Sequence, residues 1–281
     1  TAQTGVSGTV GNTAVGYVSG AAVTTGIKNT FLGGYAGRQT TDVDAATCIG
    51  YASGDADMTS DADGTTGVGS WACQNITSGI GNTAVGSLAL RTENDGDFNT
   101  AVGYQALTAQ TGTTGLVANT AVGYKAGVAI TKGRFNTIMG RDALYVDDVG
   151  DGSTAIGYAA LYSQNSDSDN EDTGNTGVGY YSGLYNVTGT NNTYLGHNAG
   201  MGVSTKSHSN CVYIGKDAGL EAYTGAGNIA IGASAMDDTG GTASGQSENN
   251  IFVGFHAGGG DWANAKTDNV VAIGQSAGAS I

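Results

Sequence analysis

A short phrase that ends around a glycine recurs along this whole sequence. Residues 12–17 read Asn-Thr-Ala-Val-Gly-Tyr, and the same letters return at 99–104 and 119–124. Fifteen strict or looser copies follow one another at intervals of 17 to 22 residues. Such self-similarity predicts a solenoid in which each copy forms one coil. The glycines on which the copies align, here called anchor glycines, are Gly16, Gly33, Gly50, Gly69, Gly86, Gly103, Gly123, Gly140, Gly157, Gly179, Gly196, Gly215, Gly232, Gly254 and Gly274.

The residues before each anchor glycine predict a β-strand. The preceding residue is aliphatic in every copy, and two positions earlier stands Thr in eleven copies, then Val212, Ile229, Ile251 and Val271. Side chains two positions apart share one face of a strand, so we expect both registers to point into the coil. The predicted core residues are Val15, Leu32, Ile49, Val68, Val85, Val102, Val122, Ile156, Val178, Leu195, Ile214, Ile231, Val253 and Ile273, with Met139 in the same register.

Composition agrees with a solenoid rather than a globule. Leu, Ile, Val and Phe make up only about 17% of the chain, too little for a spherical core but enough for a narrow column. The 50 glycines suit tight bends, and the absence of Pro suits a backbone that donates every N–H along the stack. Three residues after the anchor stands Ala or Ser, which predicts a crowded position. We expect an all-β parallel β-solenoid of about 15 coils, one continuous domain over residues 1–281.

Charge and motif content exclude several functions. A net charge of −14 argues against a nucleic-acid partner and against an anionic membrane surface. No apolar run approaches the roughly 20 residues that span a bilayer, so we expect no membrane insertion. His197, His208 and His256 belong to no catalytic or zinc motif, and the sequence therefore predicts no catalytic residues and no enzyme. Cys48, Cys73 and Cys211 are too scattered for a disulfide framework and are expected to be buried.

Two insertions concentrate carboxylates. Alternating acids on a loop could supply the six to eight oxygens that Ca²⁺ requires, although neither loop matches a known calcium motif. A solvated bulge that keeps rods apart is the simpler interpretation. The candidate calcium ligands are Asp55, Asp57, Asp61 and Asp63 in one insertion, and Asp167, Asp169, Glu171 and Asp172 in the other.

Aromatic and amide side chains recur at fixed registers. Asn stands at the strand start in many copies, for example Asn82, Asn99 and Asn119, which predicts an amide ladder inside a bend. Tyrosines that follow the anchor are expected to pack as a ladder between coils, and they could instead stack on sugars or line a seam between chains. These aromatics are Tyr17, Tyr51, Tyr104, Tyr124, Tyr158 and Tyr180.

The later copies resemble the head repeats of trimeric autotransporter adhesins of the YadA type. Asn228-Ile229-Ala230-Ile231-Gly232 with Ala235, and residues 269–274 with Ala277, match that spelling best. The Asn-Thr-Ala-Val-Gly-Tyr form is similar to repeats of phage tail fibres. The resemblance implies a left-handed parallel β-roll, three chains around one axis, and display outside the cell, on a cell surface or virion. It also implies a non-enzymatic structural and adhesive fibre whose receptor is a host-surface glycan or protein.

The first residues of the chain also belong to the repeat. Residues 1–5 recur at 108–112, which predicts that Thr1 lies within a coil and that the chain is a segment of a longer fibre or a subunit stacking end to end.

Three other functions are alternatives to an adhesive fibre, and the first is a phage tail-fibre shaft for host recognition. A glycan-hydrolysing tail spike would need a pair of close acids that the sequence does not reveal. An ice-binding face would need outward Thr, whereas Val and Ile in the last four copies indicate that this register points inward.

Overall fold

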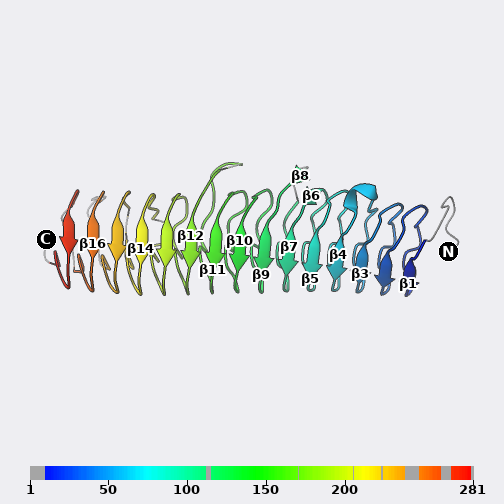
Figure 1. The fold of residues 1–281 in the computed structure, drawn as a ribbon, viewed down its shortest axis with the longest axis horizontal. Coiled ribbons are helices and arrows are strands. Elements are labelled where there is room, and N and C mark those ends of the chain that lie inside the picture. The colour runs from blue at the N-terminus through cyan, green and yellow to red at the C-terminus, as the bar shows by residue number, and fades with distance from the viewer. Residues whose placement is uncertain are drawn as a thin grey trace. The chain divides into compact units, whose positions relative to one another are not determined.

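The computed structural model describes residues 10–111, 115–169, 171–204, 206–222, 224–237, 247–260 and 267–279. Thr1–Gly5, predicted to lie within a coil, falls outside these ranges. The chain is all-β and forms a parallel β-solenoid with one three-residue strand per coil (Figure 1). It divides into two compact units, residues 1–136 (unit 1) and 137–281 (unit 2). The solenoid prediction is confirmed, while one continuous domain and left-handedness stay predictions.

Unit 1 stacks seven strands in chain order, each parallel to the next. They are β1 (Thr13–Val15), β2 (Thr30–Leu32), β3 (Thr47–Ile49), β4 (Thr66–Val68), β5 (Thr83–Val85), β7 (Thr100–Val102) and β9 (Thr120–Val122). The register is strict, because each strand's first residue pairs with the first residue of the next. The insertions hold the short pair β6 (Gly96–Asp97) and β8 (Gly115–Leu116) and a 3₁₀ turn at Ser60–Ala62.

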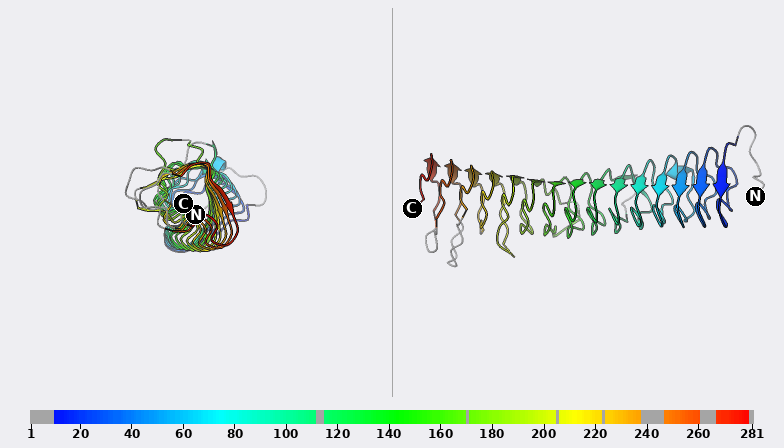
Figure 2. Two further views of the ribbon diagram at one scale, coloured as in Figure 1. Left: turned by 90° about the vertical axis from the view of Figure 1, so that its left-hand side faces the viewer. Right: turned by 90° about the horizontal axis from the view of Figure 1, so that it is seen from below.

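Unit 2 repeats this arrangement with eight strands. They are β10 (Thr137–Met139), β11 (Thr154–Ile156), β12 (Thr176–Val178), β13 (Thr193–Leu195), β14 (Val212–Ile214), β15 (Ile229–Ile231), β16 (Ile251–Val253) and β17 (Val271–Ile273). Neighbours again pair in parallel and in register. Figure 2 shows the strands of each unit following one another along one side of the coils. All fifteen predicted strands are therefore present immediately before their anchor glycines.

The face of the strand that points inward differs from the prediction. The middle residue is the buried one, as at Phe31, Cys48 and Ala101. The predicted core residues flank it and lie half-exposed or exposed, so the core assignment is wrong by one position. A three-residue strand has only one position whose side chain can enter the coil while its two neighbours face outward. The residues corrected are Val15, Leu32, Ile49, Val68, Val85, Val102, Val122, Ile156, Val178, Leu195, Ile214, Ile231, Val253 and Ile273.

The narrow interior is filled by complementary pairs of side chains. Where the middle strand residue is aromatic, as at Phe31, the residue four after the anchor is Gly37, and a Cβ there would collide with the Phe31 ring. In several coils whose middle residue is small, as at Ala101, the partner position holds a larger side chain such as Leu107, which is fully buried. The two positions thus share one volume, as close packing requires. The pairs Tyr194 with Gly200, Tyr213 with Gly219 and Phe252 with Gly258 repeat the aromatic pattern.

The anchor glycines form the bend that follows each strand. Gly86 has φ +137°, and a Cβ on it would collide with the carbonyl oxygen of Gly103 in the next coil. Only glycine combines this dihedral angle with so close an approach. Three residues after each anchor, the predicted crowded position is confirmed, because residues such as Ala89 and Ala106 are fully buried.

A buried asparagine ladder connects successive coils at the start of the strands. The side-chain oxygen of Asn82 accepts the backbone N–H of Asn99 at 2.8 Å, and Asn99 does the same for Asn119 at 3.0 Å. The Asn82 amide group also donates to the carbonyl of Gly96 at 2.8 Å. Each amide thereby satisfies backbone groups that no strand partner reaches. The predicted amide ladder is confirmed.

Candidate functional site

Two of the three side chains in every strand point away from the coil and form what we call the strand face. It consists of the first residue of each strand, Thr or later Val and Ile, and the third, which is aliphatic. Leu32 is 46% exposed, Val85 38% and Leu195 47%. No charged or aromatic side chain occupies either register of the strand face. Each unit therefore carries a regular, uncharged surface of hydroxyl, methyl and larger aliphatic groups.

Aromatic rings follow the anchor glycines of unit 1 in a row beside the strand face. Tyr17, Tyr35, Tyr51 and Trp71 contact one another edge to face, with ring centres 5.4, 5.6 and 5.7 Å apart. Tyr104 and Tyr124 stack at 5.6 Å. The predicted ladder of Tyr17, Tyr51, Tyr104 and Tyr124 is thus confirmed. Tyr35 and Trp71 were missed because they stand one residue later in their coils.

The aromatic row of unit 2 has a different form. Tyr158 and Tyr180, both predicted, stack with ring centres 5.1 Å apart, and His197 stacks on Tyr180 at the same distance. A hydrogen bond with Tyr181 raises the pKa of the Tyr158 phenol. Tyr181 itself is tilted by 55° against both Tyr158 and Tyr180. The register that predicts a ladder gives no sign of this additional ring.

The first predicted calcium cluster is divided among separate protein partners. The Asp55 carboxylate pairs with the Arg38 guanidinium at 2.9 Å. The Thr41 hydroxyl donates to Asp57 at 2.9 Å, and the backbone N–H of Asp44 donates to Asp63 at 2.7 Å. Asp61 lies in the 3₁₀ turn. Through these contacts Asp55, Asp57 and Asp63 connect neighbouring coils to one another.

The second acidic insertion is likewise not a metal cage. The backbone N–H of Asp167 donates to the Glu171 carboxylate at 3.0 Å, and Asp172 forms a β-bridge with Asp151. Asp169 lies in the same exposed segment. Within the described ranges, no three His, Cys, Asp or Glu side chains are grouped so that they could hold a metal ion. The structure therefore does not assemble either predicted calcium site.

The histidines lie in three different settings. His197 is 3.9 Å from the carboxylate of Asp217, and His256 is 3.6 Å from that of Asp237. His208 is buried, and its Nε2 lies 2.8 Å from the Tyr194 hydroxyl. Burial lowers the pKa of His208 to about 4. His208 stands in a coil that is two residues longer than the basic repeat, and the repeat pattern gives no sign that it enters the core.

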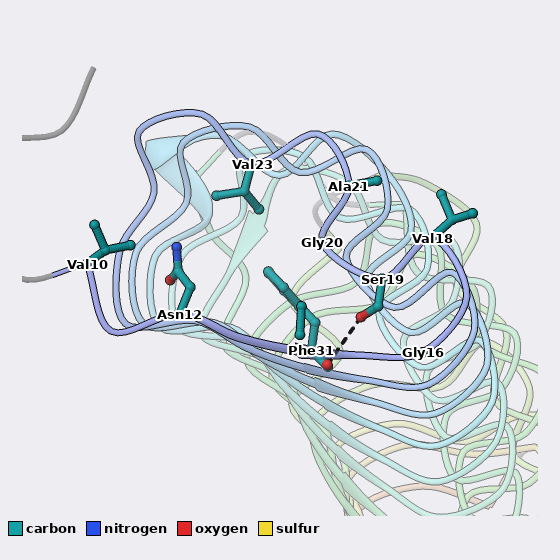
Figure 3. Close-up of a pocket in the computed structure, with 10 residues that line it drawn as sticks. Val10, Asn12, Gly16, Val18, Ser19, Gly20, Ala21, Val23 and Phe31 are labelled. Atoms are coloured by element: carbon teal, nitrogen blue, oxygen red, sulfur yellow. Dashed lines mark hydrogen bonds between the residues drawn. The ribbon is translucent and has the colours of Figure 1, made fainter. Parts of the chain in front are cut away.

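The interior of the first coil of unit 1 forms a hollow of about 470 Å³. Figure 3 shows Phe31 pointing into it, with Val23 on the opposite wall. The Ser19 hydroxyl donates to the backbone carbonyl of Phe31 at 3.1 Å. Its lining belongs to the same registers that fill later coils, so this hollow continues the core column rather than forming a separate ligand site.

The cysteines and the helix content bear on two further predictions. Cys48, Cys73 and Cys211 are free and buried, as expected. Burial raises the pKa of the Cys48 thiol to about 12. Among the residues that the structure describes, no helix has the length and apolarity needed to cross a bilayer.

Comparison of the chain with models of known protein families, with curated proteins and with solved structures gave no match. The functional inference consequently depends on the strand face, the aromatic rows and the repeat itself.

Proposed function

We propose that this chain is part of a non-enzymatic structural and adhesive fibre in which copies associate side by side through the strand face. The observation that supports this most is the outward position of the aliphatic register. Leu32, Val85 and Leu195 are each more than a third exposed, and each belongs to a continuous row rather than standing alone. Contiguous apolar surface is rare on monomeric proteins and is typical of association surfaces.

A second copy of the same chain fits the strand face better than an unrelated partner. The face repeats once per coil at the strand spacing of about 4.8 Å, so two copies match over many coils once one pair of coils is aligned. It carries no charge in a chain with 34 charged residues, as expected for the centre of an interface. Three copies around one axis, as the adhesin resemblance implies, would bury all three faces together, and we propose a homotrimer.

The fold suits a passive fibre. Parallel strand pairing, the asparagine ladder and the anchor glycines connect each coil to its neighbours, which gives a repetitive scaffold within each unit. Insertions such as 56–63 and 165–169 lengthen individual coils and include exposed residues, and solenoids commonly contact partners through such insertions. The proposal places the fibre outside the cell, on a cell surface or on a virion. A phage tail-fibre shaft shares this architecture, and the two differ in what flanks the repeats.

The mass of the full-length chain in solution tests the proposal. Sedimentation equilibrium is expected to give three times the chain mass of 27.8 kDa. Leu32→Lys combined with Val85→Lys, which sets like charges against one another in the interface, should reduce the mass to that of one chain. Asn94→Lys is the matched control, because it adds a charge to an exposed position outside the strand face and should leave the trimer intact.

A single-chain mass for the unmodified protein at all concentrations up to about 100 μM would contradict association through this face. One observation then favours ice binding as a second candidate. Thr13, Thr30 and Thr47 face outward in register, so the inward orientation that argued against an ice-binding surface is wrong. An unassociated chain of that kind would separate the freezing and melting temperatures of ice, whereas the proposed trimer buries these threonines and would not.

A further inference from the structure

Tyrosines gather on three adjacent coils of unit 2. Six of the 14 tyrosines fall between residues 145 and 185. Tyr158 and Tyr180 occupy the usual register after the anchor glycine, but Tyr145, Tyr162 and Tyr181 do not. In other coils the register of Tyr145 and Tyr162 holds residues such as Ala, Arg and Leu, and the register of Tyr181 is aromatic at Tyr35 and Trp71 and otherwise holds residues such as Ala, Ser and Leu. The repeat alone therefore does not account for this concentration of phenol rings.

Five of these rings form two stacked pairs and one inclined ring. Tyr145 and Tyr162 stack with their centres 4.9 Å apart and 5° between their planes. Tyr158 and Tyr180 form the second stack at 5.1 Å, and Tyr181 contacts both of its rings at 5.3 and 4.1 Å. Interaction with the Tyr181 phenol raises the pKa of Tyr158, and interaction with the Tyr180 phenol raises the pKa of Tyr181, so the three hydroxyl groups lie close to one another.

Three of these five rings border a groove of about 360 Å³, inside the range of roughly 300–1,000 Å³ that is typical of small-ligand sites. Tyr158, Tyr162 and Tyr181 line it together with Leu184 and Met201. A second hollow of about 490 Å³ shares Tyr185 and Met201 with the first, so the depression extends into the next coil.

Polar groups stand at the rim of this aromatic surface. Asp142 and Ser163 border the first hollow, and Asn198 and Glu221 border the second. The Asp142 carboxylate is held by the Arg141 guanidinium at 3.0 Å. Carboxylate, amide and hydroxyl groups around aromatic rings match a ligand that presents C–H groups on one side and hydroxyl groups along its edge. Two carboxylates and a net charge of −14 disfavour an anionic ligand.

We propose that this groove, the tyrosine groove, binds a neutral oligosaccharide. Pyranose rings would lay their C–H faces against Tyr158, Tyr162 and Tyr181 and hydrogen-bond through their hydroxyl groups to Asp142, Asn198 and Glu221. The inference rests on the proposed adhesive function, for which it names the ligand class and the site. No bond is made or broken, because the groove acts as a binding surface.

Titration calorimetry on the full-length chain tests the proposal with five probes: cellohexaose, chitohexaose, maltohexaose, xylohexaose and mannohexaose. At least one is expected to bind with a Kd below about 1 mM. Tyr158→Leu and Tyr181→Leu, which remove a ring but keep apolar bulk, should each weaken that binding about tenfold or more. Tyr104→Leu is the matched control, because Tyr104 occupies the register of Tyr158 in unit 1 and should leave binding unchanged.

Two results would overturn the tyrosine groove. One is the absence of binding for all five probes at 10 mM; the other is binding that both groove variants retain in full. Circular dichroism of each variant verifies that the solenoid is folded, and Tyr181→Phe, which keeps the ring, should preserve most of the affinity. Sedimentation on the same samples separates this proposal from the association of chains. Sugar binding by a single-chain species would contradict only the proposed trimer. A trimer that binds no sugar would contradict only the proposed sugar site.

Discussion

Single residues at the bends decide how closely successive coils approach. The anchor glycines have φ between +127° and +142°, where side-chain-bearing residues are strained. Positions two and four residues later also adopt positive φ, but there non-glycine residues such as Gln105 and Leu107 are accommodated in the left-handed region. The anchor glycine is therefore required for two reasons, its dihedral angle and the adjacent carbonyl, whereas the later positions accept a side chain such as Leu107 where no aromatic ring from the strand fills the space.

Gly86→Ala should destabilise the solenoid by about 3 kcal/mol, because it adds backbone strain and a collision with the Gly103 carbonyl. Thermal unfolding followed by circular dichroism measures the effect as a lower midpoint. Gly34→Ala is the control, since its Cβ would meet only the Tyr51 ring at 3.7 Å and its φ is not in the strained region. Equal midpoints for the two variants would show that the anchor register tolerates a side chain.

The repeat pattern predicts where the strands lie but not which of their faces points inward. Their positions could be predicted, because an aliphatic residue before an invariant glycine and a β-branched residue two earlier define a short extended segment. Their inward face could not, because three residues contain a single alternation and either phase satisfies it. The informative signal was the pairing of Phe31 with Gly37 and of Ala101 with Leu107, which marks the middle residue as interior.

The insertions and aromatic rows were predictable only in part. Tyr158 and Tyr180 follow the repeat and form the expected stack. Tyr181 and Trp71 depart from the repeat by one position, and only the backbone path shows that they join their neighbours. The acidic insertions illustrate the reverse error, because Asp55 and Asp63 are close in sequence and yet are directed to different partners.

The insertion between β13 and β14 places His208 in the core and should make stability depend on pH. His208 has a pKa of about 4 when folded, against 6.5 as its ordinary value, so the unfolded chain binds the proton first as the pH falls. The contribution of neutral His208 to the free energy of unfolding is fully present above pH 6.5 and decreases by about 3 kcal/mol as the pH falls to 4. His208→Gln should lessen this loss.

Urea unfolding at pH 7 and pH 4.5 compares the two proteins. Carboxylates that titrate in the same interval are common to both, so the difference between the proteins isolates His208. Identical losses of stability would mean that His208 is not held neutral beside Tyr194 in the folded state.

At the level of the whole chain, the residues that were expected to form the core instead supply the surface through which we propose that copies associate. The interior is filled by Ala, Cys, a few aromatic residues and one or two large aliphatic side chains per coil, such as Leu90 and Leu107, because each coil is narrow. The aliphatic residues of the strand face lie outside. A partner copy would remove them from water, which stabilises the association by roughly 25 cal/mol for each Å² of apolar surface buried. The composition that suggested a thin core is equally consistent with a shared one.

Disulfide cross-linking at β7 tests most directly whether the outward register joins copies. Background reactivity should be low, because the native cysteines are buried and Cys48 already occupies the inward register that Ala101→Cys would fill. Under mild oxidation, Val102→Cys should yield a covalent pair of about twice 27.8 kDa, while Ala101→Cys remains a single chain on a non-reducing gel. Pairs formed by Ala101→Cys and not by Val102→Cys would contradict both the orientation of the strands and the association proposed from it.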